Sequence, residues 1–385
     1  MKKLKVLFVL HDAALMGAPM VMLHFLRWLR AHSEVEMTIL LKSGGILEQE
    51  FERLAPVHRW RPGMLPEKAG LRLLSFFSRV LFKKGVPVPF PASLKAGSFD
   101  LIYLNTADTM DLAPLLKRLF NCPVIAHIHE LSYSLHAYFP NAFSPENQFS
   151  VDHYIAASES VRKNLMKSYD IAPEKLQLVN EFIPVDHMPV PDVSLSEIKK
   201  ELQLGNGFVV GGVGQGGWRK GTDIFIRLAA AVHQLIPDIP VTFIWVGDQS
   251  AEIRAQHAYE IEHLSLNGKI IFTGLKRHSQ NYFQVFDIFA LTSREDPFPL
   301  VSLEAAAMSK PVLCFQGTGG IPEIISRETG GVFPYGDVDG MAARIAEYCR
   351  SPGQIAETGR NAAKMVRNYD VGILAPKLLA LLYGY

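Results

Sequence analysis

The sequence predicts an α/β protein with two doubly wound parallel sheets, one in each of two domains that face each other across a cleft. Three observations support this fold class. Short runs rich in Val, Ile and Phe recur along the 385 residues, and most do not alternate apolar with polar residues. Such strands are typical of parallel sheets covered on both faces. Segments with helical periodicity separate these runs, and the chain is too long for one ordinary core.

The predicted strands fall into two sets. The first set comprises residues 4–10, 37–40, 101–105, 123–128 and 153–158. The second set comprises residues 208–214, 241–247, 269–274, 287–293, 311–315 and 331–333. Helical periodicity is clearest over residues 20–32 and 223–236, and residues 368–385 also read as a helix.

The segment between the two sets, residues 181–207, is rich in proline and polar residues, which favours an interdomain linker. We therefore expect a first domain over residues 1–185 and a second domain over residues 186–369. The carboxyl ends of the strands should face the cleft, because ligands bind at this edge of open α/β sheets.

Composition excludes several classes of protein. No run of about eighteen apolar residues predicts a transmembrane helix. The apolar run behind the basic N-terminus ends at His11 without the small-residue cleavage site of a signal peptide. Cys122, Cys314 and Cys349 are widely spaced and form neither a metal motif nor a disulfide framework. These features predict a cytoplasmic protein.

Basic residues are concentrated in the first quarter of the chain. Residues 1–100 contain fifteen Lys and Arg against eight Asp and Glu, although the formal net charge of the whole chain is only +1. Within residues 71–90, cationic and large apolar residues alternate at helical spacing. This pattern fits a helix that lies on an anionic membrane surface. A core-facing helix with a solvated basic side is the alternative.

Glycine-rich turns at strand ends lead into helices at Gly17, at residues 211–217 and at residues 317–325. Glycines let the backbone approach a ligand closely, and free N–H groups at a helix N-terminus suit a phosphate. Arg219 and Lys220 add positive charge beside the second turn, which favours an anionic ligand there. For the turn at Gly17, an ordinary strand-to-helix connection is an equal alternative.

A polar loop within residues 291–315 carries Arg294, Glu295 and Asp296 and precedes a helix that contains Glu304. Ionised carboxylates form short, strong hydrogen bonds with hydroxyl groups, so Asp296 and Glu304 suit a sugar or a ribose. The alternative for Glu304 is an exposed acid that complements the dipole of its helix.

The glycine turns, the linker and the loop with Asp296 and Glu304 follow one another along the chain in an order that resembles the large family-four glycosyltransferases. These are retaining enzymes of the GT-B architecture with two Rossmann-like domains. The resemblance spans nearly the whole chain and is strongest over residues 207–345, which include SREDPFPLVSLEAAAMSKPVLCF and GTGGIPEII. It implies transfer of a hexosyl unit from a nucleoside-diphosphate sugar to an acceptor hydroxyl, without a metal or another cofactor. It also implies that a last helix, at about 370–385, packs back on the first domain.

The resemblance assigns roles to individual residues. The family's Glu-x7-Glu motif falls on Asp296 and Glu304. Glu304 would bind the ribose of the donor, and Asp296 would face the transferred sugar together with the backbone N–H groups of residues 298–300. Lys220 would neutralise the diphosphate, and His129 would lie near the sugar and the acceptor. The other residues expected in the donor site are Gly17, Gln215, Gly216, Arg219, Arg294, Glu295, Phe298, Pro299 and Leu300.

The sequence departs from the family's pattern at three places. Asp296 stands where the family usually has Glu. Gln215 replaces an arginine five residues before Lys220, which weakens stabilisation of the diphosphate unless Arg219 or Arg294 compensates. Residues 179–185 take the place of the usual Asn-Gly-Ile/Val-Asp stretch. A nucleotide-sugar binder without catalysis, or an epimerase or phosphorylase of the same fold, is the alternative function.

The expected partners are a nucleotide-sugar donor and a carbohydrate or lipid-linked acceptor of envelope polysaccharide or glycolipid synthesis, at the inner face of the membrane. Nucleic acid is not expected.

Two patterns imitate metal motifs. His127-x-His129 lacks a third ligand nearby, and Asp337-x-Asp339 begins a helix, where we expect N-capping.

Overall fold

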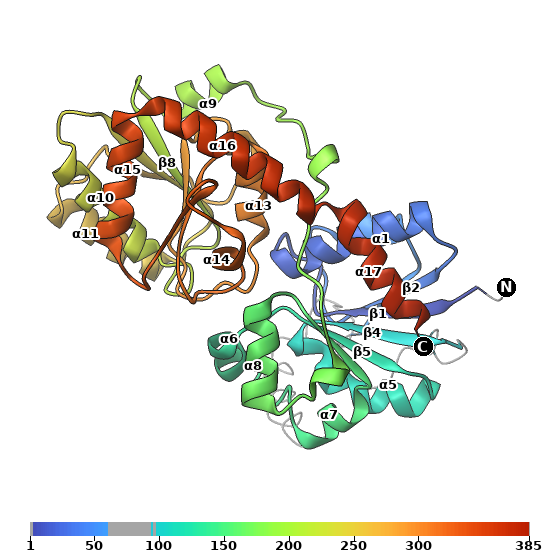
Figure 1. Cartoon of the computed structure of the whole chain (residues 1–385). Coiled ribbons are helices and arrows are strands. Elements are labelled where there is room, and N and C mark those ends of the chain that lie inside the picture. Colours follow the sequence, from blue (N-terminus) through green and yellow to red (C-terminus); the bar gives the residue numbers. More distant parts are fainter. Residues whose placement is uncertain (1–2, 61–93, 95–97, 385) are drawn as a thin grey trace, which may run out of the picture.

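Two parallel sheets form the centre of the protein, as predicted (Figure 1). The structure, a computed structural model, describes residues 3–60, 94 and 98–384. Counted over these residues, the first sheet has seven strands in the order β3-β2-β1-β4-β5-β6-β7, and the second has six in the order β10-β9-β8-β11-β12-β13. The strand order reverses at β1/β4 and at β8/β11, which is the switch point of a doubly wound sheet.

The strands of the first sheet are β1 (Lys5–Leu10), β2 (Glu36–Leu41), β3 (Val57–Arg59), β4 (Leu101–Asn105), β5 (Val124–Ile128), β6 (His153–Ala156) and β7 (Leu176–Leu178). The strands of the second sheet are β8 (Phe208–Val213), β9 (Val241–Val246), β10 (Ile270–Phe272), β11 (Ile288–Leu291), β12 (Val312–Phe315) and β13 (Gly330–Phe333). The central strands β4, β5, β11 and β12 are buried along their whole length. This burial explains why their sequences do not alternate.

The helices of the first domain are α1 (Gly17–His32), α2 (Glu48–Glu52), η1 (Ala107–Leu112), α5 (Ala113–Phe120), α6 (Ser132–Tyr138), α7 (Pro145–Ser150), α8 (Glu159–Tyr169) and η2 (Pro173–Lys175). The remaining helices are η3 (Val185–His187), α9 (Leu195–Glu201), α10 (Thr222–Leu235), α11 (Ala251–His263), α12 (Gln280–Phe283), α13 (Leu300–Ala307), α14 (Ile321–Ile324), α15 (Val338–Arg350), α16 (Pro352–Val366), η4 (Arg367–Tyr369) and α17 (Val371–Tyr383).

The chain passes between the two domains twice, and the two crossings lie side by side. The N–H of Ile183 donates to the carbonyl of Tyr369 (3.2 Å), and the N–H of Val371 donates to the carbonyl of Ile183 (2.9 Å). Asp370 accepts hydrogen bonds from the N–H groups of Val185 and Gly372, and the second of these caps the N-terminus of α17. The segment that leads into the second domain is therefore hydrogen-bonded to the segment by which the chain returns to the first domain.

After the second crossing, α17 lies beside α1 of the first domain (Figure 1). Leu374, Leu378 and Leu382 of α17 are buried in the same apolar cluster as Phe25 and Leu29 of α1. Their spacing of four residues places them on one face of the helix. The last helix thus completes the covering of a sheet whose strands lie some 200 to 370 residues earlier in the chain.

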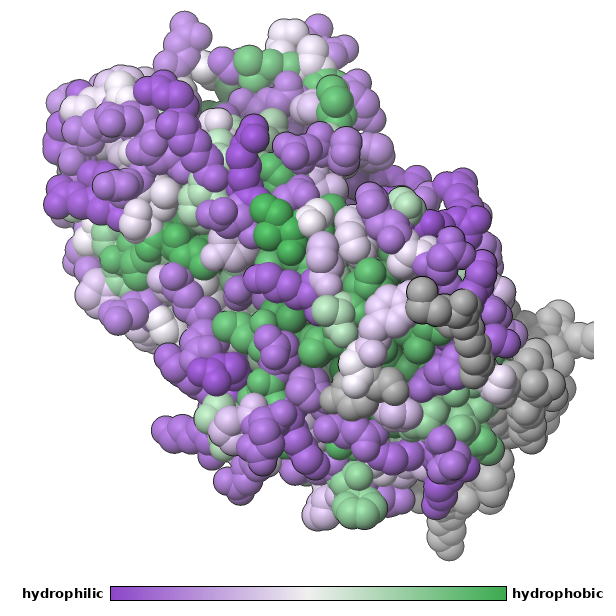
Figure 2. Space-filling model, turned by 45° about the vertical axis from the view of Figure 1, so that its right-hand side comes forward, coloured by the Kyte–Doolittle hydropathy of each residue, from purple (hydrophilic) through white to green (hydrophobic). Residues whose placement is uncertain are grey.

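Polar residues cover most of the face shown in Figure 2, and apolar residues gather in a band across its middle. None of the helices in the described part of the chain has the length and apolarity needed to cross a membrane. The basic apolar segment 71–90 lies outside the described residues.

Candidate functional site

The loop between β11 and α13 is fixed by the glycine turn that follows β12. The N–H of Asp296 donates to the carbonyl of Thr318 (2.7 Å), and the N–H of Gly320 donates to the carbonyl of Pro297 (2.8 Å). Gly319 has φ +147°, and a Cβ atom at this position would lie 1.7 Å from the carbonyl oxygen of Asp296. A residue with a side chain at 319 would therefore push the Asp296 loop away.

The glycine-rich turn after β8 contacts the same loop from the other side. Gly221 begins α10 with φ +65°, and a Cβ atom there would lie 2.0 Å from the carbonyl oxygen of Thr292. The hydroxyl of Thr292 donates to the carbonyl of Gly221 (2.9 Å). Gly216 also lies in this turn, and its N–H donates to the carbonyl of Asp248 (2.7 Å). These contacts fix the backbone on both sides of Lys220.

Lys220 and Asp296 form a buried ion pair, with 2.5 Å between Nζ and Oδ2. Arg219 lies 3.4 Å from the other carboxylate oxygen, and the hydroxyl of Ser293 donates to Oδ2 (3.0 Å). Burial alone would raise the pKa of Asp296, but the two cations outweigh it and hold this pKa below its usual range. Burial lowers the pKa of Lys220 despite its ionic partner. The fold thus brings the two cations of the glycine-rich turn into contact with the carboxylate of the polar loop.

Glu304 lies in the second turn of α13 and is partly buried. Burial raises the pKa of its carboxyl group to about 7. The first turn of α13 contains no acidic residue, so Glu304 is not the exposed first-turn acid of the alternative interpretation. A partly buried carboxylate on the helix that follows the loop of Asp296 is instead suited to accept hydrogen bonds from a ligand.

Residues 298–300 contribute fewer donors than expected. Pro299 has no backbone N–H, so the expectation that all three residues offer one was wrong for Pro299. Leu300 opens α13, and the first N–H groups of a helix lack partners within the helix. Phe298 is buried, and its ring packs against Tyr369 with 5.6 Å between centroids.

Arg294 is paired within the second domain, and its guanidinium also donates to the carbonyl of Trp218 in the glycine-rich turn (2.7 Å). Its guanidinium forms two hydrogen bonds with the carboxylate of Asp223 (2.8 and 2.6 Å) and lies over the ring of Trp218. Gln215 is exposed. Arg219, in contrast, lies 3.4 Å from Asp296. Of the two arginines expected to compensate for Gln215, Arg219 is therefore better placed than Arg294.

Glu295 binds the first domain instead of facing the donor loops. Its carboxylate accepts hydrogen bonds from the N–H groups of Tyr133 (2.7 Å) and Ser134 (2.9 Å) and from the hydroxyl of Ser134 (2.9 Å). These N–H groups belong to the first turn of α6 and would otherwise lack partners. The ring of Tyr133 packs against Trp218 of the second domain with 4.6 Å between centroids.

A second carboxylate bridges the domains in the same manner. Glu323 of α14 accepts hydrogen bonds from the N–H groups of Glu159 (3.1 Å) and Ser160 (2.7 Å) in the first turn of α8. The hydroxyl of Ser160 donates to the same carboxylate (2.5 Å). We name Glu295 and Glu323 the interdomain clasps. Glu295 immediately precedes Asp296, and Glu323 directly follows the glycine turn that contacts the Asp296 loop, so both interdomain contacts are made by the segments that fix Asp296.

Replacing Glu295 by alanine should accelerate hydrogen exchange at the amides of Tyr133 and Ser134 about fivefold. The loss of a partly exposed, charge-assisted contact costs about 1 kcal/mol, because solvent screens it. Exchange followed by mass spectrometry measures this effect on peptides that contain α6. Glu328→Ala, which removes an exposed carboxylate of the same domain, is the matched control. Equal exchange in both variants would contradict the assignment of Glu295 as a clasp.

Two of the residues expected in the site, Gly17 and His129, belong to the first domain. Gly17 begins α1, whose N-terminus has no side-chain cap, and nothing lies within 4 Å of a Cβ atom built at Gly17. His129 follows β5, is buried, and is hydrogen-bonded to Asn105 and Glu181. Neither Glu181 nor Asn105 was expected in the site, because they lie 52 and 24 residues from His129 in sequence.

The two patterns that imitate metal motifs have other roles. The side chain of Asp337 accepts a hydrogen bond from the N–H of Gly340 (2.9 Å), which confirms the predicted N-cap of α15. Nδ1 of His127 lies 2.6 Å from the hydroxyl of Tyr103. Within the described ranges, no three His, Cys, Asp or Glu side chains are arranged to hold a metal ion.

The fold and these loops define a glycosyltransferase of the GT-B architecture. Residues 16–187 match the family model "Glycosyltransferase Family 4", and residues 207–351 match the model "Glycosyl transferases group 1". The two matches together cover most of the chain, which therefore belongs to the family-four, group 1 glycosyltransferases.

The curated relatives of this chain include a glycosyltransferase and a glycolipid synthase. The chain is 25% identical over 301 residues to the D-inositol 3-phosphate glycosyltransferase of Corynebacterium glutamicum, covering 74% of this chain and 72% of the relative. It is 28% identical over 228 residues to the alpha-galactosylglucosyldiacylglycerol synthase of Streptococcus pneumoniae, covering 57% of this chain and 58% of the relative.

Solved structures share the fold over the whole chain. Anabaena Alr3699/HepE in complex with UDP and glucose superposes with a TM-score of 0.80 at 20% identity, covering 99% of this chain and 100% of HepE. The lipopolysaccharide outer core galactosyltransferase WaaB has a TM-score of 0.71 at 13% identity, with 99% of each chain covered. At these identities the likeness establishes the shared architecture.

Proposed function

We propose that the protein transfers a hexosyl unit from a nucleoside-diphosphate sugar to an acceptor hydroxyl, with retention of the anomeric configuration. The observation that carries this proposal is the arrangement of Lys220, Asp296 and Glu304. A cation and a carboxylate are held together on two interlocked loops, and a second carboxylate follows on α13. Glu304 would bind the ribose, and Asp296 the transferred sugar.

The barrier to transfer lies mainly in the charge that the leaving diphosphate gains as the glycosidic bond breaks. Cations and helix N-termini directed at this charge lower the barrier. Lys220 and Arg219 supply the cations. The uncapped N-terminus of α1 at Gly17 supplies N–H groups. His129 and Asp296 position the sugar and acceptor in this mechanism, and neither forms a covalent bond.

Uridine is the base that we propose for the donor, since the structural neighbour HepE contains UDP and glucose. For the acceptor we propose a lipid-linked saccharide or glycolipid, in line with the name of the Streptococcus relative. The protein would meet such an acceptor at the inner face of the membrane through residues 71–90. Sedimentation with vesicles of anionic lipid tests this contact, and absence of binding at low salt would refute it.

The experiment that tests the function is a thermal-shift screen against UDP-, GDP-, ADP- and TDP-sugars, followed by NMR of the products. We expect the largest increase in Tm with one uridine sugar. That donor should then release UDP slowly in the absence of an acceptor, with the α configuration kept in the sugar product. Stabilisation without any release of UDP would mean a binder without catalysis. No stabilisation by any of the four nucleotides would refute the proposal.

A further inference from the structure

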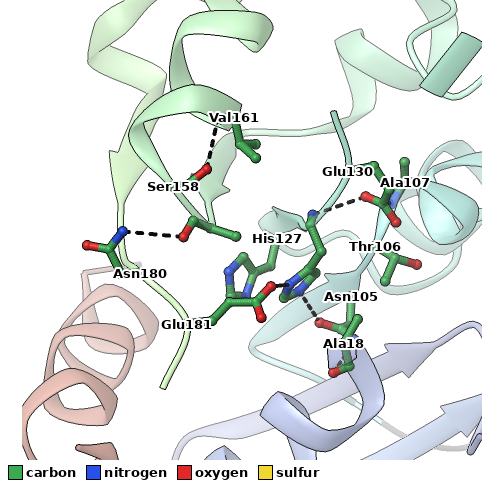
Figure 3. A network of polar contacts seen from close by, with 12 residues as sticks. Ala18, Asn105, Thr106, Ala107, His127, Glu130, Ser158, Val161, Asn180 and Glu181 are labelled. Atoms are coloured by element: carbon green, nitrogen blue, oxygen red, sulfur yellow. Dashed lines mark hydrogen bonds and ion pairs between the residues drawn. The ribbon is translucent and has the colours of Figure 1, made fainter. Parts of the chain in front are cut away.

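His129 is held by hydrogen bonds at both nitrogens of its ring. Nδ1 lies 2.8 Å from Oε1 of Glu181, and Nε2 lies 2.7 Å from Oδ1 of Asn105. The side chains of His129 and Glu181 are 4% and 5% exposed, so water does not compete for these contacts. Asn105 ends β4, and Glu181 lies in the segment that leads to the second domain (Figure 3).

The hydrogen-bond partners of Asn105 determine where the protons of this ring lie. The amide nitrogen of Asn105 donates to the carbonyl of Ala18 (3.4 Å), which leaves its oxygen directed at His129. An amide oxygen only accepts, so Nε2 of His129 must carry a proton. Nδ1 faces a carboxylate, which also accepts. Both ring nitrogens therefore donate when Glu181 is ionised, and the ring is then an imidazolium.

The charged groups around Glu181 come from both domains. Burial raises the pKa of Glu181, and the adjacent His129 opposes this effect. The charges of Lys220 and Asp296 in the second domain also act on Glu181, with opposite signs. Glu130 is a partly buried carboxyl group nearby, and it binds backbone N–H groups, including that of His129 at 3.0 Å. Glu181 thus hydrogen-bonds to the imidazole of the first domain and is near enough to the ion pair of the second to be influenced by both of its charges.

We propose that Glu181 is a positioning residue of the transfer reaction: its carboxylate keeps His129 doubly protonated and fixes the imidazolium beside the Lys220–Asp296 pair. The inference rests on the proposed function. A buried cation needs a buried counter-charge, and Glu181 supplies it within hydrogen-bond distance. Both nitrogens of the ring are occupied, so His129 contributes a fixed positive charge to the site and does not act as a base.

Replacement of Glu181 by glutamine tests the proposal by two independent readouts. The first is the ¹⁵N spectrum of the His129 ring at pH 7, assigned by its loss in His129→Asn. We expect two protonated nitrogens in the wild type and one unprotonated nitrogen in Glu181→Gln. The second readout is kinetic. We expect kcat to fall about tenfold or more, because a charged group of the site is lost, while KM for the donor changes much less.

Two further variants separate positioning from folding. Glu181→Asp retains the carboxylate, so the ring should stay doubly protonated and kcat should recover in part. Glu130→Gln alters a nearby, partly buried carboxyl group that binds backbone N–H groups, and the ring spectrum should remain that of the wild type. Thermal unfolding of each variant shows whether the fold is retained.

The outcomes that overturn the proposal are specific. An unprotonated ring nitrogen in the wild type would refute the doubly protonated state. An unchanged ring spectrum or an unchanged kcat in folded Glu181→Gln would refute the positioning role. If the wild type transfers no sugar from any donor, the proposed function fails, and the positioning role falls with it. The wild-type ring spectrum would still decide whether Glu181 holds an imidazolium.

Discussion

Replacing Lys220 by alanine is expected to lower kcat for sugar transfer about 10²- to 10³-fold, the effect of removing one group that stabilises developing negative charge. Lys220 lies on the glycine-rich turn that we assign to the diphosphate, and its ammonium is held in place by Asp296. The interaction grows as the leaving group gains charge, so kcat should fall more than KM rises. Steady-state kinetics with the donor selected by the thermal-shift screen measure this effect.

Loss of Lys220 also leaves the buried Asp296 with Arg219 as its nearest cation, so stability must be measured in parallel. Breaking a buried ion pair costs about 3 kcal/mol or more. Lys310→Ala is a suitable control, because Lys310 is another lysine of this domain whose pKa is lowered by burial. Equal losses of kcat in the two variants would mean that destabilisation, and not the missing charge, explains the result.

Affinity for the nucleotide should depend on pH through Glu304, whose pKa burial raises to about 7. The ionised carboxylate forms the stronger hydrogen bonds with ribose hydroxyls. We therefore expect the Kd for UDP to increase as the pH falls below 7, by up to about tenfold per pH unit. In Glu304→Gln the affinity should be about 10- to 100-fold lower at pH 8 and nearly independent of pH. Isothermal titration calorimetry between pH 6 and 8 provides the comparison.

The same carboxyl group should affect the stability of the free protein with the opposite sign. Between pH 4.5 and about 7, folded Glu304 retains a proton that the unfolded chain has already released. The free energy of unfolding therefore decreases as the pH rises through this interval. Thermal unfolding without ligand should show the decrease in the wild type relative to Glu304→Gln. A Tm difference between the two proteins that does not vary with pH would contradict the raised pKa.

Most of the fold could be predicted because its strands are buried on both faces. Such strands read as continuous apolar runs, and β4 and β5 were recognised in this way. The edge strands β3 and β7 were missed, since each has only three residues and is partly exposed. Whether such a short segment forms an edge strand depends on the neighbouring strand with which it pairs, and its own sequence does not predict this pairing.

The site was predicted less evenly than the fold. Local motifs predicted that Lys220 and Asp296 lie on neighbouring loops, where the structure joins them in an ion pair, and that Glu304 lies on the helix that follows. The partners of Arg294 and Glu295 were not readable. They depend on Asp223, 71 residues before Arg294, and on α6, some 160 residues before Glu295. A charged residue in a conspicuous loop thus indicates a site, but its role depends on groups that only the folded chain brings near.

The packing of α17 on α1 has a consequence for how the protein is made. During synthesis on the ribosome the first domain emerges first, yet its sheet cannot gain the apolar face of Leu374, Leu378 and Leu382 until α17 has been translated. Until then the matching surface of α1 stays uncovered while the whole second domain is being added. The first domain begins to fold before the second but is completed after it, so chaperone binding to the nascent chain should persist until α17 has left the ribosome.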